Sequence, residues 1–393
     1  MRRILMTLAF AASGLLCFAQ GGNTGNGGYD GNYQSLAERV LNLEKKNDAF
    51  NMYFNYGSSF QMSDATSDWT SAFRAKQLRW EVKGTFGDHL SYRLRHRMNK
   101  ANAAMSEENF AKATDIMMVG WKFNDKLSLM GGKMCQFWGG FEFDENPMYI
   151  YQYSDMVDCM DNFLAGAALS FTPVAGQEFV LNISNSYSGK FADEYGVGAR
   201  TAAGKALEAS NHPLAYIFNW NGSFFDGMLN TRWAVGSYTQ GRIVGESSDL
   251  RDNMVFIGTQ LNLPKFQWYV DYMGAWEGLD RLRIATSEFG GAGYQTDVNY
   301  NSFVTKANWQ FAPGFNLMAK GMYETATVGD GPKYRTSLGY IGSLEYYPDS
   351  TQDFRVFLAY IGRKFAYSND AMKGLDYNTN RIEIGFMYRI KAY

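Results

Sequence analysis

The stretch from His89 to Lys100 carries the side chains best suited to act on a passing solute. Side chains of a β-strand alternate between two faces. One face carries Leu90, Tyr92 and Leu94, and the other carries Ser91, Arg93, Arg95 and Arg97. A soluble core does not take such a row of inward arginines without acids to pair them. A membrane barrel does, because its apolar face meets lipid and its polar face meets water. We therefore expect a positively charged pore wall.

More basic side chains fall on the inward faces of the neighbouring expected strands. We assign six residues to an anion pathway: Arg79, Lys83, Arg93, Arg95, Arg97 and Lys122. Arginines two positions apart on a strand stand about 7 Å from one another, which suits an anion passed from one site to the next. The alternative is a set of screened wall charges that keep the lumen wet. Both interpretations predict a water-filled channel.

The segment from Phe137 to Asn162 is acidic and contains no Lys or Arg. Its carboxylates are Glu142, Asp144, Glu145, Asp155, Asp158 and Asp161. We expect this loop to fold into the barrel and to place its acids opposite the arginine wall, where the transverse field would orient dipolar solutes. The alternative is a calcium-binding or merely solvated external loop.

Two cysteines, Cys135 and Cys159, remain after the expected processing of the N-terminus. An exported chain can join them in a disulfide, which would pin both ends of the acidic loop. Closing a loop of about 25 residues contributes roughly 3 kcal/mol. Spacing alone does not establish the geometry of a disulfide, so free thiols are the alternative.

Signals for catalysis are few. The chain has 3 histidines, too few for a His-rich metal site. His89 and Ser91 have the spacing of a His-x-Ser pair, but we expect both to face the lumen beside a turn, where lipid does not reach. We predict that the protein is not an enzyme and uses neither a metal nor a cofactor.

The elements that must position these residues are strands. From residue 50 onward, about sixteen alternating segments follow one another, an even number as bacterial barrels require. Tight turns alternate with longer connections, and the turn dipeptides are Gly87-Asp88, Asn124-Asp125, Ala175-Gly176, Asp226-Gly227, Pro264-Lys265 and Pro313-Gly314. Short periplasmic turns and long outer loops are typical of outer-membrane barrels.

Composition agrees with this architecture. Aromatic residues make up 16% of the chain, which has 41 glycines and 7 prolines, and outer-membrane barrels have aromatic girdles. A soluble sandwich also alternates, but it rarely keeps so many aromatics at strand ends. No apolar run reaches the roughly 18 residues of a membrane helix. The net charge of −2 points to no charged partner, and we expect no nucleic acid.

The N-terminal residues predict export. Residues 1–19 have the pattern of a signal peptide, with Arg2 and Arg3 before an apolar run and the small Ala19 at its end. Residues 20–32 are a flexible lead rich in Gly and Asn. Residues 33–48 have heptad spacing, and we expect them to form a short periplasmic helix, either a small coiled coil or an amphipathic helix packed on the barrel end. We assign 50–393 to the barrel.

Motifs around the acidic loop resemble the phosphate-selective porin O/P family. The similar runs are Gly131 to Glu142, Tyr149 to Tyr151, and Asp161 to Gly166. The resemblance covers the whole mature chain in layout but only this region in motif. This chain differs from the family in carrying Gly139-Gly140 where a proline is common. Membership implies a sixteen-stranded, usually trimeric, channel in the outer membrane, but it does not imply phosphate.

We therefore predict an all-β protein, a sixteen-stranded antiparallel transmembrane β-barrel with a short N-terminal helix. It would be a homotrimeric porin in the outer-membrane lipid of a Gram-negative cell. It would pass small hydrophilic solutes with a moderate preference for anions, phosphate among them. The alternatives are a sugar or oligosaccharide channel, a structural or adhesive barrel with a plugged lumen, and an outer-membrane hydrolase.

Overall fold

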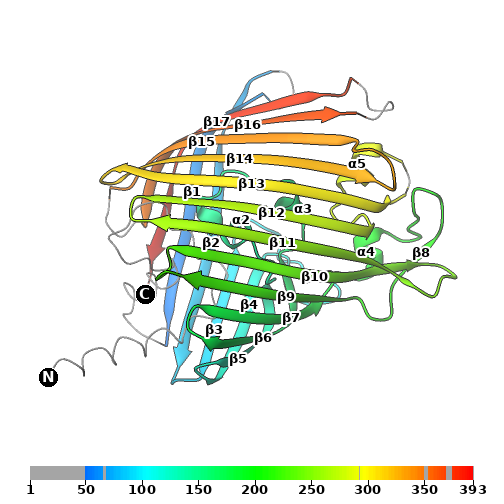
Figure 1. Ribbon diagram of the computed structural model, residues 1–393, viewed down its shortest axis with the longest axis horizontal. Helices are drawn as coiled ribbons and strands as arrows, with labels where there is room; N and C mark the ends of the chain where they lie inside the picture. Colours follow the sequence, from blue (N-terminus) through cyan, green and yellow to red (C-terminus); the bar gives the residue numbers. More distant parts are fainter. Residues whose placement is uncertain (1–48, 65–67, 292, 349–352, 369–373, 393) are drawn as a thin grey trace.

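The structure is a computed structural model that describes residues 49–64, 68–291, 293–348, 353–368 and 374–392. Over these ranges the chain forms a closed antiparallel β-barrel of sixteen strands (Figure 1). The last strand, β17 (Tyr377–Lys391), pairs with β1 (Asn51–Ser63) and so closes the wall. The signal peptide, the lead and the helix predicted for residues 1–48 lie outside the described residues.

Each barrel strand pairs with its neighbours in the chain. Between β1 and β17 the wall consists of β2 (Thr70–Phe86), β3 (Leu90–Arg97), β4 (Thr114–Asn124), β5 (Leu127–Cys135), β6 (Phe163–Val174), β7 (Gln177–Asn185), β9 (Leu214–Phe224), β10 (Leu229–Ile243), β11 (Asp249–Leu263), β12 (Phe266–Leu279), β13 (Thr296–Ala312), β14 (Phe315–Val328), β15 (Arg335–Tyr346) and β16 (Phe354–Tyr367). The short β8 (Leu207–Glu208) pairs with the end of β10 and takes no place in the wall.

The long connections contain short helices. They are α2 (Phe141–Asp144), the 3-10 helix η2 (Pro147–Tyr149), α3 (Asp155–Cys159), α4 (Phe191–Tyr195) and α5 (Ile284–Phe289). Within the described ranges, every helix is too short or too polar to cross a membrane. Figure 1 shows α4, α5 and β8 at one end of the barrel, and β17 finishing at the other.

Glycines shape the short turns at the end where β17 finishes. Gly176 has a φ of 80°, and a Cβ there would stand 2.7 Å from the carbonyl oxygen of Ser223. Gly314 has a φ of 75°, and its Cβ would stand 2.7 Å from the carbonyl oxygen of Tyr347. A side chain disfavours positive φ and would also clash, so both turns need glycine.

The outer face of the wall is apolar. Met117, Val119 and Trp121 on β4 are 52%, 54% and 46% exposed. They stand directly opposite Leu94, Tyr92 and Leu90 on β3. Directly opposite residues of antiparallel strands share a face, so the apolar face of β3 also points outward. The predicted fold and the register of β3 are therefore confirmed.

Candidate functional site: a charged lumen with an inward-folded loop

The arginine row of β3 lies on the inner face of the barrel, beside the inner face of β2. The register pairs Arg93 with Lys83, Arg95 with Glu81 and Arg97 with Arg79. We call these six residues, together with Asp115, the arginine patch. Within the patch, the side chain of Glu81 forms an ion pair with its diagonal neighbour Arg93, two positions from its register partner. Oε1 of Glu81 lies 2.7 Å from Nε of Arg93.

A β-bulge on β4 brings Asp115 into this patch. Between β3 and β4, Arg95 pairs with Ile116 and His96 with Thr114, so Asp115 is the extra residue. A bulge re-aims a side chain, and Asp115 is only 2% exposed. Strict alternation along the sequence would have placed Asp115 on the outer face, so sequence reasoning missed it. One signal was available in the sequence: three inward arginines need an acid nearby, and Asp115 is an acid on the next strand.

Asp115 lies among three arginines. Its Oδ1 lies 2.8 Å from Nε of Arg97, and its Oδ2 lies 3.5 Å from both Nη1 of Arg79 and Nε of Arg95. The Nε atoms of Arg79 and Arg95 donate no hydrogen bond to any residue that the structure describes. The guanidinium groups of Arg95 and Arg97 stand 5.1 and 5.9 Å from the ring centre of Phe163. The arginine patch thus keeps a net positive charge.

Two lysines complete the predicted set of cations. Lys83 belongs to the patch, and its Nζ stands 5.0 Å from the ring centre of Tyr53. Lys122 lies near the turn after β4, where its Nζ is 2.6 Å from Oδ1 of Asp125. The structure therefore gathers five of the six predicted cations into one patch and places Lys122 at the short-turn end of the barrel.

The His-x-Ser spacing of His89 and Ser91 does not bring the two side chains together. His89 stacks on the outward-facing Trp121 with ring centres 5.4 Å apart, and its Nδ1 lies 2.6 Å from the carbonyl oxygen of Lys122. Ser91 is buried on the inner side and donates a hydrogen bond of 3.5 Å to the carbonyl oxygen of Gly120. The expectation that both side chains face the lumen was wrong for His89, because the turn redirects it.

The acidic loop, residues 137–162, lies inside the barrel between β5 and β6. Its helix α2 contacts β11 and β12, and α3 contacts β13; Figure 1 shows both helices behind the near wall. The backbone N–H of Gly140 donates to the carbonyl oxygen of Arg232 on β10 over 3.0 Å. Gly139 has a φ of 71°, and a Cβ there would stand 3.0 Å from the same oxygen. These glycines let the loop reach the wall.

Wall cations neutralise most carboxylates of the acidic loop. Glu142 pairs with Lys320 (2.5 Å), Glu145 with Lys306, Asp144 with Arg232 (3.1 Å), and Asp155 with Arg335 (2.6 Å) and Arg363 (2.7 Å). The cations stand on β10, β13, β14, β15 and β16, whereas the arginine patch lies on β2, β3 and β4. Asp158 and Asp161 are exposed. Most of the negative charge of the acidic loop is therefore neutralised by the wall strands that the loop packs against.

Aromatic side chains hold the acidic loop against that wall. Trp138 and Phe141 are fully buried. Trp138 stacks on Tyr238 and Phe256, with ring centres 4.9 and 5.3 Å apart, and Phe141 stacks on Tyr269 at 6.0 Å. Aromatic pairs at these separations contribute beyond the area they bury. The inward aromatics of β10, β11 and β12 are therefore covered by the loop.

The two cysteines are free thiols, so the predicted disulfide is absent from the structure. Cys135 ends β5 opposite Phe163, and Cys159 ends α3 with an exposed side chain. The base of the loop is held by a backbone hydrogen bond of 3.0 Å from Gln136 to Asn162. Ion pairs and stacking fix the loop without a covalent link, which removes the reason for the predicted bond.

Comparison with solved structures shows the porin fold. OmpT of Vibrio cholerae is 12% identical with a TM-score of 0.56, and 88% of this chain and 99% of that chain are covered. The outer membrane channel DcaP of Acinetobacter baumannii is 9% identical with a TM-score of 0.60, covering 87% and 97%. An anion-selective porin from Comamonas acidovorans is 11% identical with a TM-score of 0.55, covering 87% and 99%.

A comparison with curated proteins gave no match. The family model described as phosphate-selective porin O and P matches residues 50–390, which is nearly the whole barrel. The closed sixteen-strand wall, the charged lumen and the inward loop agree with that match. The chain belongs to the phosphate-selective porin O and P family, and it is an outer-membrane channel.

Proposed function

We propose that the protein is a water-filled diffusion channel for small hydrophilic solutes with a moderate preference for anions, phosphate among them. The observation that carries this proposal is the arginine patch, in which five basic side chains face two carboxylates. In a narrow channel with low-dielectric walls, such a patch lowers the energy of a passing anion and raises that of a cation. The similar porin from Comamonas acidovorans is described as anion-selective.

The charge of the acidic loop supports the same conclusion. Bare carboxylates across the lumen would cancel the field of the arginine patch. Most of them are instead paired with Arg232, Lys306, Lys320 or Arg335 at the opposite wall. The selectivity is therefore set by the arginine patch, while the loop narrows the passage.

The triple variant Arg93→Gln, Arg95→Gln and Arg97→Gln tests the proposal. The reversal potential across a planar bilayer in asymmetric KCl should move toward cation preference, most at low salt, where screening is weakest. The matched control is Arg251→Gln, since Arg251 is exposed on β11. An unchanged reversal potential at about 0.1 M salt would make the row mere wall charge.

A sugar channel would need free aromatic faces along the lumen. The inward aromatics Tyr238, Phe256 and Tyr269 are stacked under the acidic loop, and Phe357 packs edge-on against Tyr151 of the same loop at 5.1 Å. Their faces hold the loop in place. The observed packing therefore favours the anion channel over an aromatic slide.

Assembly and export complete the proposal. A homotrimer agrees with the apolar outer wall and with the trimer form described for OmpT of Vibrio cholerae, a similar fold. Export would use residues 1–19 as a cleaved signal peptide, so that the mature chain begins at Gln20. The mass of the purified subunit tests the cleavage site.

A further inference from the structure

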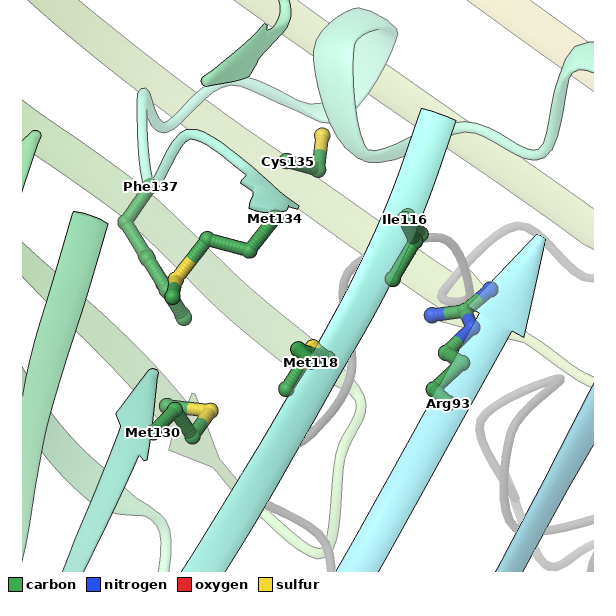
Figure 2. A pocket seen from close by; sticks show the side chains of 7 residues that line it. All are labelled: Arg93, Ile116, Met118, Met130, Met134, Cys135 and Phe137. Atoms are coloured by element: carbon green, nitrogen blue, oxygen red, sulfur yellow. The ribbon is translucent and has the colours of Figure 1, made fainter. Parts of the chain in front are cut away.

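The wall beside the arginine patch carries an apolar pocket inside the lumen. Met118 on β4 and Met130 and Met134 on β5 lie next to Phe137, where the acidic loop begins. Ile116, Cys135 and Arg93 complete the lining, with Arg93 at its edge (Figure 2). We call these seven residues the methionine pocket. Met130 and Met134 are each 1% exposed, whereas Met118 is half-buried. Apolar side chains here are unexpected, because a barrel lumen is normally polar.

Charge at the edge of the pocket is positive. Arg93 lines the pocket and stands opposite Lys83, and Arg95 follows two positions along β3. Glu81 accepts the hydrogen bond of Arg93 but is a single carboxylate among these cations. Figure 2 shows Arg93 on one side of β4 and Met130 and Met134 on the other. Arg93 stands directly opposite Met118, one strand spacing or about 5 Å away, and Met130 and Met134 lie one strand further on β5. An anionic head at Arg93 would therefore place its apolar tail first against Met118.

A guest larger than one water molecule requires the pocket to widen. In the structure its cavity is about 10 Å³, room for about one water molecule. Methionine has three rotatable bonds and a polarizable sulfur, so a methionine lining adapts to irregular guests more readily than a branched one. The half-buried Met118 is placed to move first. A pocket that served only to seat Phe137 would not need a positively charged edge.

We propose that the methionine pocket binds the apolar part of small amphiphilic anions, namely carboxylates with a short alkyl chain, during their passage. This rests on the anion pathway proposed above and adds a class of solute to it. The carboxylate exchanges with Glu81 at Arg93, and the chain lies along Met118 and Met130. Such solutes bind in the methionine pocket on their way through the channel, whereas chloride passes without binding there.

Block of the chloride current by a series of linear carboxylates tests the proposal. Acetate, butyrate, hexanoate and octanoate are added to the purified wild-type channel in KCl. The concentration for half-block should fall with each added methylene, by at most about fourfold, the value for a fully buried CH₂. The uncharged 1-hexanol and the cation hexylammonium should block far less than hexanoate, because neither pairs with Arg93.

Variants separate the tail site from the head site. Met118→Gln and Met130→Gln should each flatten the dependence on chain length, whereas Arg93→Gln should raise all half-block concentrations and keep the slope. The control is Met228→Gln, since Met228 is exposed beside a short turn. A flat series in the wild type, or equal block by 1-hexanol, overturns the proposal even where the reversal potential still shows anion preference. A cation-preferring reversal potential instead overturns the anion channel itself.

Discussion

Asp115 is the carboxylate that lies nearest to most of the arginines in the patch. It contacts Arg79, Arg95 and Arg97, while Glu81 contacts Arg93. Replacing this acid removes one negative charge from the centre of the patch, and three guanidinium groups lose the same partner at once. Asp115 therefore limits how strongly the patch attracts an anion.

The variant Asp115→Asn should have a stronger anion preference than the wild type. Asparagine has nearly the same shape but no charge, so three guanidinium groups would act on the passing ion without an opposing carboxylate. The reversal potential in asymmetric KCl measures this, and the shift should shrink at high salt. Asp125→Asn is the control, because Asp125 is exposed at a turn. An unchanged potential in Asp115→Asn would contradict this role.

The buried carboxyl of Asp144 should make the selectivity depend on pH. Burial raises the pKa of this loop carboxyl from 3.8 to about 6, although Arg232 opposes the change. As pH falls through 6, the Asp144 carboxylate of the folded protein is protonated, whereas that of an unfolded chain stays ionised until a lower pH. The cost of burying this carboxylate is therefore present above pH 6 and is lost in acid. The neutral acid leaves the charge of Arg232 uncompensated. The reversal potential should therefore move further toward anions between pH 7 and pH 5, and Asp144→Asn should remove that part of the change.

At the scale of elements, bulges decide which charges enter the lumen. Besides the bulge at Asp115, the ladder between β1 and β2 shifts at Gly57 and Ser58, which leaves Lys76 as the extra residue on β2. Lys76 then reaches Glu383 on β17, 2.5 Å away. Strict alternation of side chains along β2 and β4 would have turned Lys76 and Asp115 toward lipid. The two bulges thus place Asp115 beside its arginines and Lys76 beside Glu383.

The acidic loop is an element held by buried ion pairs. Glu142 has no exposed side-chain surface, and Lys320 donates both to its Oε1 over 2.5 Å and to the carbonyl oxygen of Gln152 over 2.8 Å. Glu142 in turn accepts the backbone N–H of Ser154 over 2.7 Å. One pair therefore joins the wall to two separate points of the loop.

The variant Lys320→Met should loosen the acidic loop and widen the passage. Losing one member of a buried pair typically costs about 3–5 kcal/mol, because the remaining charge is uncompensated. Single-channel conductance should rise and become noisier. Adding Glu142→Gln in the double variant should recover part of the lost stability. Lys205→Met is the control, because its pair with Glu246 is exposed and such pairs contribute little. Equal conductance in Lys320→Met and the wild type would contradict this anchoring.

The sequence predicted the wall better than the contents of the lumen. Alternation is a local property, so Leu90, Tyr92 and Leu94 could be assigned to the outer face from their spacing alone. The bulge at Asp115 and the partners of the acidic loop depend on residues far apart in the chain. Arg335, which holds Asp155, was not among the expected inward cations. The expected disulfide failed for the same reason, since spacing contains no distance between Cys135 and Cys159.

At the scale of the whole molecule, the outer wall must be covered by lipid or by other barrels. Residues such as Phe73, Phe303 and Leu358 are 84%, 52% and 50% exposed. Apolar side chains of this size suit contact with lipid tails and with the apolar wall of another barrel.

Native mass measurement in mild detergent should give three copies of a subunit that begins at Gln20. Removing residues 33–48 should weaken this trimer only slightly, because about two heptads contribute little on their own. Chemical cross-linking in membranes before extraction provides the control against dissociation by detergent. A subunit found alone by both methods would contradict the trimer, and a mass that includes residues 1–19 would contradict the cleavage.

The pairing of β1 with β17 also dictates the order in which this chain can be completed. Asp64 and Asn380, which are 316 positions apart, are joined by hydrogen bonds of the barrel seam. Contacts so distant in sequence form late, because the chain between them must lose conformational entropy before the contacts can stabilise it. Until β17 has arrived, every partial barrel has two open edges that can pair with another chain. Newly made chains must therefore be kept apart on their way to the membrane, and the final strand is the one that ends their tendency to aggregate.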